Sequence, residues 1–279
     1  MNPLNCLVII PIYQLSFSDE EKLSLKTIRE YLGAYGICFV TPVSLDISML
    51  IQLGETVEKF EDHYFAGIGG YNRLLKCSDF YRRFAFKEYI LISQLDCLIL
   101  KDDLAHWINK GWDYIAAPWF KGFAGDHAPG LWRVGNGGLS LRKVESFLRI
   151  LKQTITAGAI YPRWGHYSWT PPFEFLEADL YRKISALNAL NPFSRQHSVE
   201  DELKRFPYNE DVFWGIEARK FDQSFKVADV SEGLNFAFEV SPRWCFEKTG
   251  RRLPFGCHAW ARYDRDFWEE VLADQEKSV

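Results

Sequence analysis

One carboxylate in an unusually apolar run is the strongest candidate for chemistry in this chain. Asp96 stands between Leu95 and Cys97 in residues 89–100 (YILISQLDCLIL), a run that we interpret as a buried strand. Burying an ionised carboxylate is costly unless the group is paired or binds a cation. We therefore interpret Asp96 as a ligand of Mg²⁺ or Mn²⁺ on a nucleotide diphosphate, because these ions prefer oxygen ligands. The alternative is a strand that ends at Leu95, with Asp96 solvated or paired with an arginine.

A glycine-rich run forms the second candidate site. In residues 134–142 (VGNGGLSLR), glycines surround Asn136 on both sides. Glycine permits a positive φ and a close approach of the backbone to a ligand. We interpret Asn136, Gly137 and Gly138 as the wall of a sugar pocket beside a sheet edge, with a plain turn or bulge as the alternative. Arg142 can be structural or can contact a phosphate.

Two adjacent acids, Glu210 and Asp211, open the segment NEDVFW. Neighbouring residues on a helix point about 100° apart, so both carboxylates cannot address one atom. We interpret one of them as a general base and the other as tied to a structural partner. The alternative is that both are acids favoured by the dipole at a helix N-terminus.

His258 lies in PFGCHAW, a loop-like sequence in which a histidine can be a metal ligand. The alternative is an ordinary core or surface histidine. The cysteines have no CxxC spacing, so we expect no zinc cluster, and we interpret Cys6, Cys38 and Cys97 as buried thiols in strand-like runs. No GxSxG sequence is present, which leaves a Ser-His-Asp hydrolase unsupported.

The start of the chain predicts the elements that position these residues. Residues 6–13 and 37–42 are typical of short buried strands, and between them Ser18 and Glu21 form a capping-box pattern that opens a helix. Such a β-α-β unit implies a parallel sheet, and ligands bind at the carboxyl ends of its strands. No GxGxxG follows the first strand, which disfavours a dinucleotide-binding fold.

The later elements are predicted from periodicity alone. Residues 158–207 are rich in proline and tryptophan, and we interpret them as an insertion or acceptor-side lid within a single domain over residues 1–279. Elsewhere we expect helices over 71–86, 143–156, 209–221 and 266–272, a strand over 113–119, and one or two strands within 227–240.

Composition excludes several classes of protein. The 279 residues are 47% apolar and 25% charged, which excludes a disordered or collagen-like chain, and the net charge of −4 does not favour a nucleic-acid partner. No apolar stretch reaches the ~18–20 residues of a membrane helix and no signal peptide is visible, so we expect no integral membrane segment. The aromatic fraction of 16% is high, and flat rings can stack on sugars as well as fill a core.

Taken together, the blocks YILISQLDCLILKDDL, DYIAAPW, VGNGGLSLR, NEDVFW and PFGCHAW resemble a family of bacterial glycosyltransferase-like domains once described only as of unknown function. More broadly, the chain is similar to GT-A glycosyltransferases, which use nucleotide-sugar donors. The resemblance covers roughly residues 4–263. It implies an α/β fold of GT-A type, with a Rossmann-like, mostly parallel central sheet flanked by helices and a Trp/Pro-rich insertion.

The resemblance also implies roles for residues on the donor side. Pro11 and Tyr13, at the exit of the first strand, would meet the nucleoside. The Asp-x-Asp metal motif of GT-A enzymes is here Gln94-Leu95-Asp96, so the second Asp is retained while Gln94 departs from the pattern and can hydrogen-bond a ribose or base. His258 stands where many GT-A enzymes supply a late histidine to the same metal.

On the acceptor side, the resemblance places the catalytic base of inverting enzymes at the acidic pair, and we assign Asp211, with Glu210 bound to the amides of its own helix. Trp164, Trp169 and Trp214 are the candidates for stacking on an acceptor sugar.

The expected reaction is glycosyl transfer from a nucleoside-diphosphate sugar to a hydroxyl of a glycan or lipid-linked acceptor, assisted by Mn²⁺ or Mg²⁺. We expect the configuration at the anomeric carbon to be inverted. We expect the enzyme to be cytoplasmic, at the inner face of the membrane, and to act in bacterial surface-glycan synthesis. The alternatives are a retaining GT-A transferase and a catalytically inactive carbohydrate-binding domain of the same fold.

Overall fold

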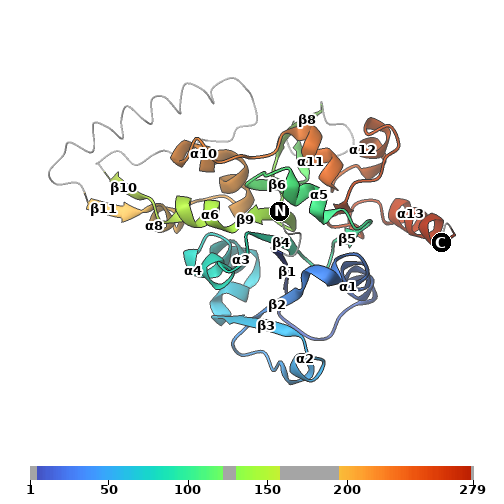
Figure 1. Cartoon of the computed structure of the whole chain (residues 1–279), viewed down its shortest axis with the longest axis horizontal. Helices are drawn as coiled ribbons and strands as arrows, with labels where there is room; N and C mark the ends of the chain where they lie inside the picture. The colour runs from blue at the N-terminus through green and yellow to red at the C-terminus, as the bar shows by residue number, and fades with distance from the viewer. Residues whose placement is uncertain (1–4, 122–129, 158–194, 278–279) are drawn as a thin grey trace.

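A six-stranded sheet forms the centre of the computed structural model, which describes residues 5–121, 130–157 and 195–277 (Figure 1). Its strands are β1 (Cys6–Pro11), β2 (Ile37–Pro42), β3 (Thr56–Phe60), β4 (Tyr89–Ser93), β6 (Tyr114–Ala116) and β9 (Leu139–Lys143). They lie in the order β3-β2-β1-β4-β9-β6. The first four are mutually parallel, whereas β9 runs antiparallel to both of its neighbours, which confirms a mainly parallel α/β sheet.

The predicted β-α-β start is confirmed. Helix α1 (Asp19–Leu32) connects β1 to β2, and its capping box is formed: Ser18 Oγ accepts from the amide of Glu21, and the Glu21 carboxylate accepts from the amide of Ser18. Both β1 and β4 are buried along nearly their whole length, as expected for central parallel strands covered on both faces.

The order of the strands creates a switch point at β1. The chain proceeds from β1 to β2 and β3 on one side, and β4 then returns to the other side of β1. At such a point the crossover connections diverge, so the crevice outside the carboxyl ends of β1 and β4 can accept a ligand. Pro11 ends β1 at this edge, and Gln94 follows β4 there.

The single strand predicted over residues 89–100 is wrong. β4 ends at Ser93, and the chain turns through Asp96 before β5 (Leu98–Ile99). The turn is closed by the amide of Cys97, which donates to the carbonyl of Gln94. Asp96 therefore lies in a turn with its side chain 49% exposed, not within a strand.

β5 belongs to a second, small sheet with β13 (Gly256–Cys257) and β12 (Ala237–Phe238). β13 pairs antiparallel with β5 and parallel with β12. The carboxyl ends of β12 and β13 therefore lie beside the turn that precedes β5. This small sheet brings residues that are distant in sequence close together in space.

Other predicted elements also divide differently. The helix expected over 71–86 is two helices, the strand over 113–119 is shared between two sheets, and the strands expected within 227–240 are mostly a helix. Asp229 explains the last difference, because its carboxylate caps that helix by accepting from the amide of Glu232. The segments are α3 (Gly67–Leu74), α4 (Ser78–Arg83), β6, β7 (Pro118–Phe120) paired with β8 (Leu131–Val134), α11 (Val230–Phe236) and β12.

The remaining elements surround the two sheets (Figure 1). Most of the predicted insertion over 158–207 lies outside the described residues. None of the helices in the described ranges is long and apolar enough to cross a membrane. The remaining helices and strands are the 3₁₀-helices η1 (Gly33–Tyr35) and η2 (Asp62–Phe65), α2 (Ser48–Gln52), α5 (Leu104–Asn109), α6 (Val144–Leu151), β10 (Thr154–Ala157), β11 (Arg195–Ser198), α8 (Val199–Leu203), α9 (Glu210–Val212), the π-helix η4 (Phe213–Glu217), α10 (Ala218–Phe221), α12 (Pro242–Lys248) and α13 (Arg265–Lys277).

Candidate functional site

The small sheet brings a histidine and two carboxylates together at the switch point. His258 directly follows β13, Glu239 directly follows β12, and Asp96 lies in the turn before β5. His258 Nε2 lies 3.4 Å from Asp96 Oδ1 and 3.3 Å from the side-chain oxygen of Gln94, while its Nδ1 lies 3.0 Å from Glu239 Oε1. The predicted donor-side residues Gln94, Asp96 and His258 therefore form one cluster.

Glu239 fixes the orientation of the imidazole. A carboxylate only accepts, so Nδ1–H of His258 donates to it, and Nε2 is left facing Asp96. Hydrogen-bonded carboxylates commonly orient metal-binding histidines in this way. Sequence reasoning missed Glu239, because only the parallel pairing of β12 with β13 places it beside His258.

The cluster fits a cation. One ligand atom each from Asp96, Cys97 and His258 lies within 4.8 Å of the others. Because Asp96 is half exposed, a bound molecule can reach the cluster from solvent. Cys97 was predicted only as a buried thiol, and burial does raise its pKa well above the usual value.

The pKa of His258 responds to the charges around it. Burial lowers this pKa, but the hydrogen bond to Glu239 and the negative charge of Asp96 raise it, and the net shift is upward. The carboxylate of Asp211 also contributes to the upward shift. Asp211 therefore belongs to the same electrostatic neighbourhood as the histidine cluster.

The glycine-rich run is explained by two close approaches. A Cβ on Gly138 would lie 2.1 Å from His258 Nε2, and a Cβ on Gly137 would lie 2.1 Å from Glu210 Oε1. Asn136 adopts a positive φ of 81°, and its side-chain oxygen accepts from the amide of Gly138. Gly137 and Gly138 therefore let the backbone lie directly against the Glu210 carboxylate and the His258 ring.

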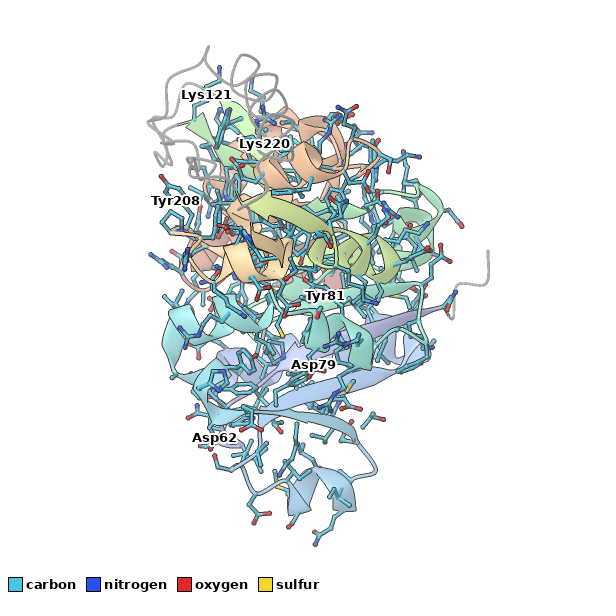
Figure 2. The ribbon with its side chains drawn as sticks, turned by 90° about the vertical axis from the view of Figure 1, so that its left-hand side faces the viewer. Asp62, Asp79, Tyr81, Lys121, Tyr208 and Lys220 are labelled. Carbon is cyan, nitrogen blue, oxygen red and sulfur yellow. The ribbon has the colours of Figure 1, made fainter. Side chains whose placement is uncertain are left out.

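Glu210 is committed to a buried ion pair. Its two oxygens accept from Arg142 at 2.8 and 2.9 Å, and the two side chains are 4% and 0% exposed. Arg142 also donates to Ser140 and to the hydroxyl of Tyr81, which lies near the middle of the molecule in Figure 2. Arg142 is thus structural, and the partner of Glu210 is this guanidinium, not the amides of its own helix as predicted.

Removing the carboxylate of Glu210 should be costly. We expect Glu210→Ala to lower the free energy of unfolding by about 3–5 kcal/mol, because it leaves the buried charge of Arg142 uncompensated. Urea unfolding measures the difference. The control is Glu247→Ala, which breaks an exposed pair with Arg251 and should change stability little. Equal effects of the two substitutions would contradict the structural role of Glu210.

Asp211 has a different environment from its neighbour. It makes a hydrogen bond only to its local backbone in the described part of the chain, accepting from the amide of Val212 at 2.9 Å. Desolvation, followed by the negative charge of Glu210, raises the pKa of Asp211 to about 7. A carboxylate with a pKa near the working pH is suited to general-base chemistry.

Of the residues predicted to contact the nucleoside or the acceptor, Tyr13 is exposed and Trp214 is buried. Pro11 and Tyr13 lie at the end of β1, where the Tyr13 ring is 66% exposed and accessible to a ligand. Trp214 is fully buried, and its indole donates to the carbonyl of Leu75, so its role is to fill the core and it is removed from the acceptor surface. Trp164 and Trp169 lie outside the described residues.

One more residue was missed by sequence reasoning. The buried hydroxyl of Tyr71 on α3 has no hydrogen-bond partner in the described part of the chain; desolvation raises the pKa of this hydroxyl, and Gln94 acts in the opposite direction. The sequence indicated only that a helix begins at Tyr71, because periodicity does not show which sheet edge a helix covers.

The fold and this site define an α/β protein with a cation-compatible polar cluster at the switch point of a mainly parallel sheet. The chain belongs to the family described as "Protein of unknown function (DUF5672)", which matches residues 55–258. No curated protein matches the chain in sequence.

Several solved structures are similar at low identity. A glycosyltransferase involved in the glycosylation of the major capsid of PBCV-1 is 9% identical, with a TM-score of 0.42 over 96% of this chain and 99% of that one. The glycosyltransferase GlyE of Streptococcus pneumoniae TIGR4 is 9% identical, with a TM-score of 0.43 over 95% of this chain and 59% of that one. The mannosyltransferase PcManGT from Pyrobaculum calidifontis, in complex with GDP-Man and Mn²⁺, is 17% identical, with a TM-score of 0.33 over 52% and 46%. These TM-scores are too low to assign a fold type.

Proposed function

We propose that this protein is a GT-A-type glycosyltransferase that moves a sugar from a nucleoside-diphosphate donor to an acceptor hydroxyl with inversion. The proposal is supported by the cluster of Asp96 and His258 at the switch point, together with the influence of the Asp211 carboxylate on that histidine. Asp96 beside His258 is suited to a cation, and Asp211, whose pKa is raised to about 7, is suited to accept a proton.

The donor would lie across the carboxyl ends of β1 and β4. The exposed ring of Tyr13 can stack on the nucleobase beside Pro11, and the amide of Gln94 can hydrogen-bond the nucleoside. The sugar would rest against Asn136 and the two glycines that follow it, where the absence of side chains lets the backbone approach closely.

Asp96 and His258 would hold the divalent cation, Mn²⁺ or Mg²⁺, next to the diphosphate. Such an ion, when bound, neutralises the charge that develops on the leaving group. Within the chain, Glu239 keeps Nε2 of His258 directed at this position. Gln94 contributes a neutral oxygen where the resembled motif has a carboxylate, so Asp96 supplies the negative charge of the motif.

Asp211 would remove the proton from the acceptor hydroxyl as that oxygen attacks the anomeric carbon. Its hydrogen bond to the Val212 amide holds one carboxylate oxygen and leaves the other for the acceptor. Glu210, held by Arg142, raises the basicity of Asp211 by its charge and does not itself take the proton.

The acceptor is proposed to be a glycan or lipid-linked sugar, with Trp164 and Trp169 as stacking residues. Bacterial surface-glycan synthesis at the cytoplasmic face of the membrane is the setting that the family resemblance favours. The segment 158–207 would then act as an acceptor-side lid of a single domain.

Calorimetry with a panel of nucleotides and nucleotide sugars, with and without Mn²⁺, tests the proposal. Cation-enhanced binding of one nucleoside diphosphate, followed by hydrolysis or transfer of its sugar, supports it. Sugar binding without any nucleotide binding would instead establish the carbohydrate-binding alternative. Retention of configuration in the product, detected by NMR, would replace the inverting mechanism with the retaining one.

We expect Glu239→Gln to weaken cation binding by about 10–100-fold, the usual effect of losing a partner that orients a ligand. The ring ¹⁵N shifts of His258 should change at the same time, because an amide no longer fixes the tautomer. Glu232→Gln, which alters a surface pair with Lys110, is the control. Unchanged affinity and unchanged ¹⁵N shifts in Glu239→Gln would rule out an orienting role.

A further inference from the structure

Cys97 lies on the buried side of the cluster formed by Asp96 and His258. Its sulfur is 3.9 Å from Asp96 Oδ1 and 3.3 Å from the carbonyl oxygen of Gly138. By contrast, the buried thiols of Cys6 and Cys38 have contacts in their strands to backbone carbonyls. Cys97 therefore differs from ordinary core cysteines in having a carboxylate and an imidazole as its neighbours.

The spacing of Asp96 and His258 is that of two ligands of a tetrahedral ion, and the sulfur of Cys97 lies somewhat farther away. Bonds of about 2.0–2.3 Å at tetrahedral angles place neighbouring ligand atoms about 3.3–3.7 Å apart. Here Asp96 Oδ1 is 3.4 Å from His258 Nε2 and 3.9 Å from the sulfur of Cys97, and all three donors lie within 4.8 Å of one another. Small side-chain adjustments would complete three vertices of a tetrahedron.

The cluster is accessible to solvent from the side of Asp96. Asp96 is half exposed, whereas Cys97 is fully buried, so the open side of the cluster is the side that solvent and the diphosphate can reach. Three protein ligands with one open position is the arrangement of catalytic zinc sites.

We propose that Asp96, Cys97 and His258 form a three-ligand site for a borderline divalent ion, Zn²⁺ or Co²⁺, which the site binds in preference to Mg²⁺. Sulfur and imidazole ligands favour these ions, whereas Mg²⁺ requires a shell of oxygens. On binding, the S–H bond of Cys97 breaks, a sulfur–metal bond forms, and the proton leaves to solvent. This inference rests on the proposed function only for the identity of the fourth ligand, a diphosphate oxygen.

Cobalt titration of the metal-free full-length protein tests the inference without any nucleotide. A Cys–Co²⁺ bond produces an intense charge-transfer absorption in the near ultraviolet, which oxygen and nitrogen ligands do not produce. We expect this band in the wild type and in the control Cys38→Ser, whose thiol is equally buried in β2. It should be lost in both Cys97→Ser and Cys97→Ala.

Calorimetry of the same variants measures selectivity. We expect Cys97→Ser to lower Zn²⁺ affinity by at least about 10-fold and to change Mg²⁺ affinity less than about 3-fold. Cobalt that binds to the wild type without the band, or that does not bind, would overturn the inference, as would a band that survives in Cys97→Ser. The wild-type spectrum shows whether a thiolate binds the ion, and the spectra of Cys97→Ser and Cys97→Ala show whether that thiolate is Cys97.

The outcome is separable from that of the proposed function. If the band is present but no nucleotide binds, the metal site stands and the transferase assignment fails. If nucleotides bind with Mg²⁺ or Mn²⁺ and the band is absent, the transferase assignment stands and the role of Cys97 fails.

Discussion

Asp211→Asn should reduce sugar transfer by roughly 10²–10⁴-fold while leaving donor affinity close to that of the wild type. Asparagine keeps the shape of the side chain and can still accept from the amide of Val212, but it cannot take a proton. Turnover with the true acceptor and donor affinity by calorimetry measure the two quantities separately.

The pH dependence of the wild type should carry the signature of Asp211. Its pKa is raised to about 7, so the carboxylate becomes available as a base only when the pH rises through about 7, and turnover should rise over the same interval. The residual activity of Asp211→Asn should not rise with pH over this interval. A wild-type profile that is flat between pH 6 and 8 would contradict the assignment.

The contribution of Asp211 to the free energy of unfolding should fall as the pH rises, whereas turnover should increase. A carboxyl whose pKa is higher in the native state favours folding fully at a pH below about 4, where it is protonated in both states. That contribution is lost as the pH rises to about 7, because the native state must then hold a desolvated charge. Asp211→Asn should therefore be about 1–2 kcal/mol more stable than the wild type at pH 8, which thermal or urea unfolding can detect.

Glu210→Gln is the matched control for this position. Glu210→Gln should clearly lower the free energy of unfolding, because it weakens the buried pair with Arg142, and it should reduce turnover less than Asp211→Asn does. If Glu210→Gln were inactive and Asp211→Asn were active, Glu210 would be the general base and Asp211 the structural residue. Normal turnover in both would exclude the inverting mechanism, and the anomeric configuration of the product should then be retained.

Asp96→Ala should abolish cation-dependent donor binding and reduce turnover by roughly 10²-fold or more, because charge on the leaving group is no longer neutralised. The structure supports a folded variant, since the side chain is half exposed and lies in a turn. Circular dichroism and an unfolding curve close to that of the wild type would establish that the fold is intact.

His258→Ala should have a smaller effect than Asp96→Ala, because one neutral ligand contributes less charge than a carboxylate and water can replace it. Asp102→Ala, an exposed acid shortly after β5, controls for a general loss of negative charge. Unchanged cation-dependent turnover in Asp96→Ala would remove this residue from the metal site, as would an effect equal to that of Asp102→Ala.

The largest differences between expectation and structure concern how apolar runs are divided. Residues 89–100 are apolar almost throughout, and hydrophobicity alone does not show where a strand leaves one sheet and joins another. After Ser93 the amide of Gln94 still donates to the carbonyl of Gly138, a partner far away in sequence, and the chain then turns away from β9 toward β5. Likewise, the partner of Glu210 could not be predicted, because Arg142 lies on a strand that only folding brings near.

The sequence by itself determined the features that depend on neighbouring residues. It predicted the β-α-β start, the capping box of Ser18 and Glu21, and the parallel sheet, because hydrophobic periodicity and caps are local properties. The tertiary structure alone decided that Asp96, Cys97, Glu239 and His258 meet, that Trp214 fills the core, and that Glu210, not Asp211, pairs with Arg142. These facts depend on strand order and on the packing of distant segments, which set burial and therefore the energetic cost of each charge.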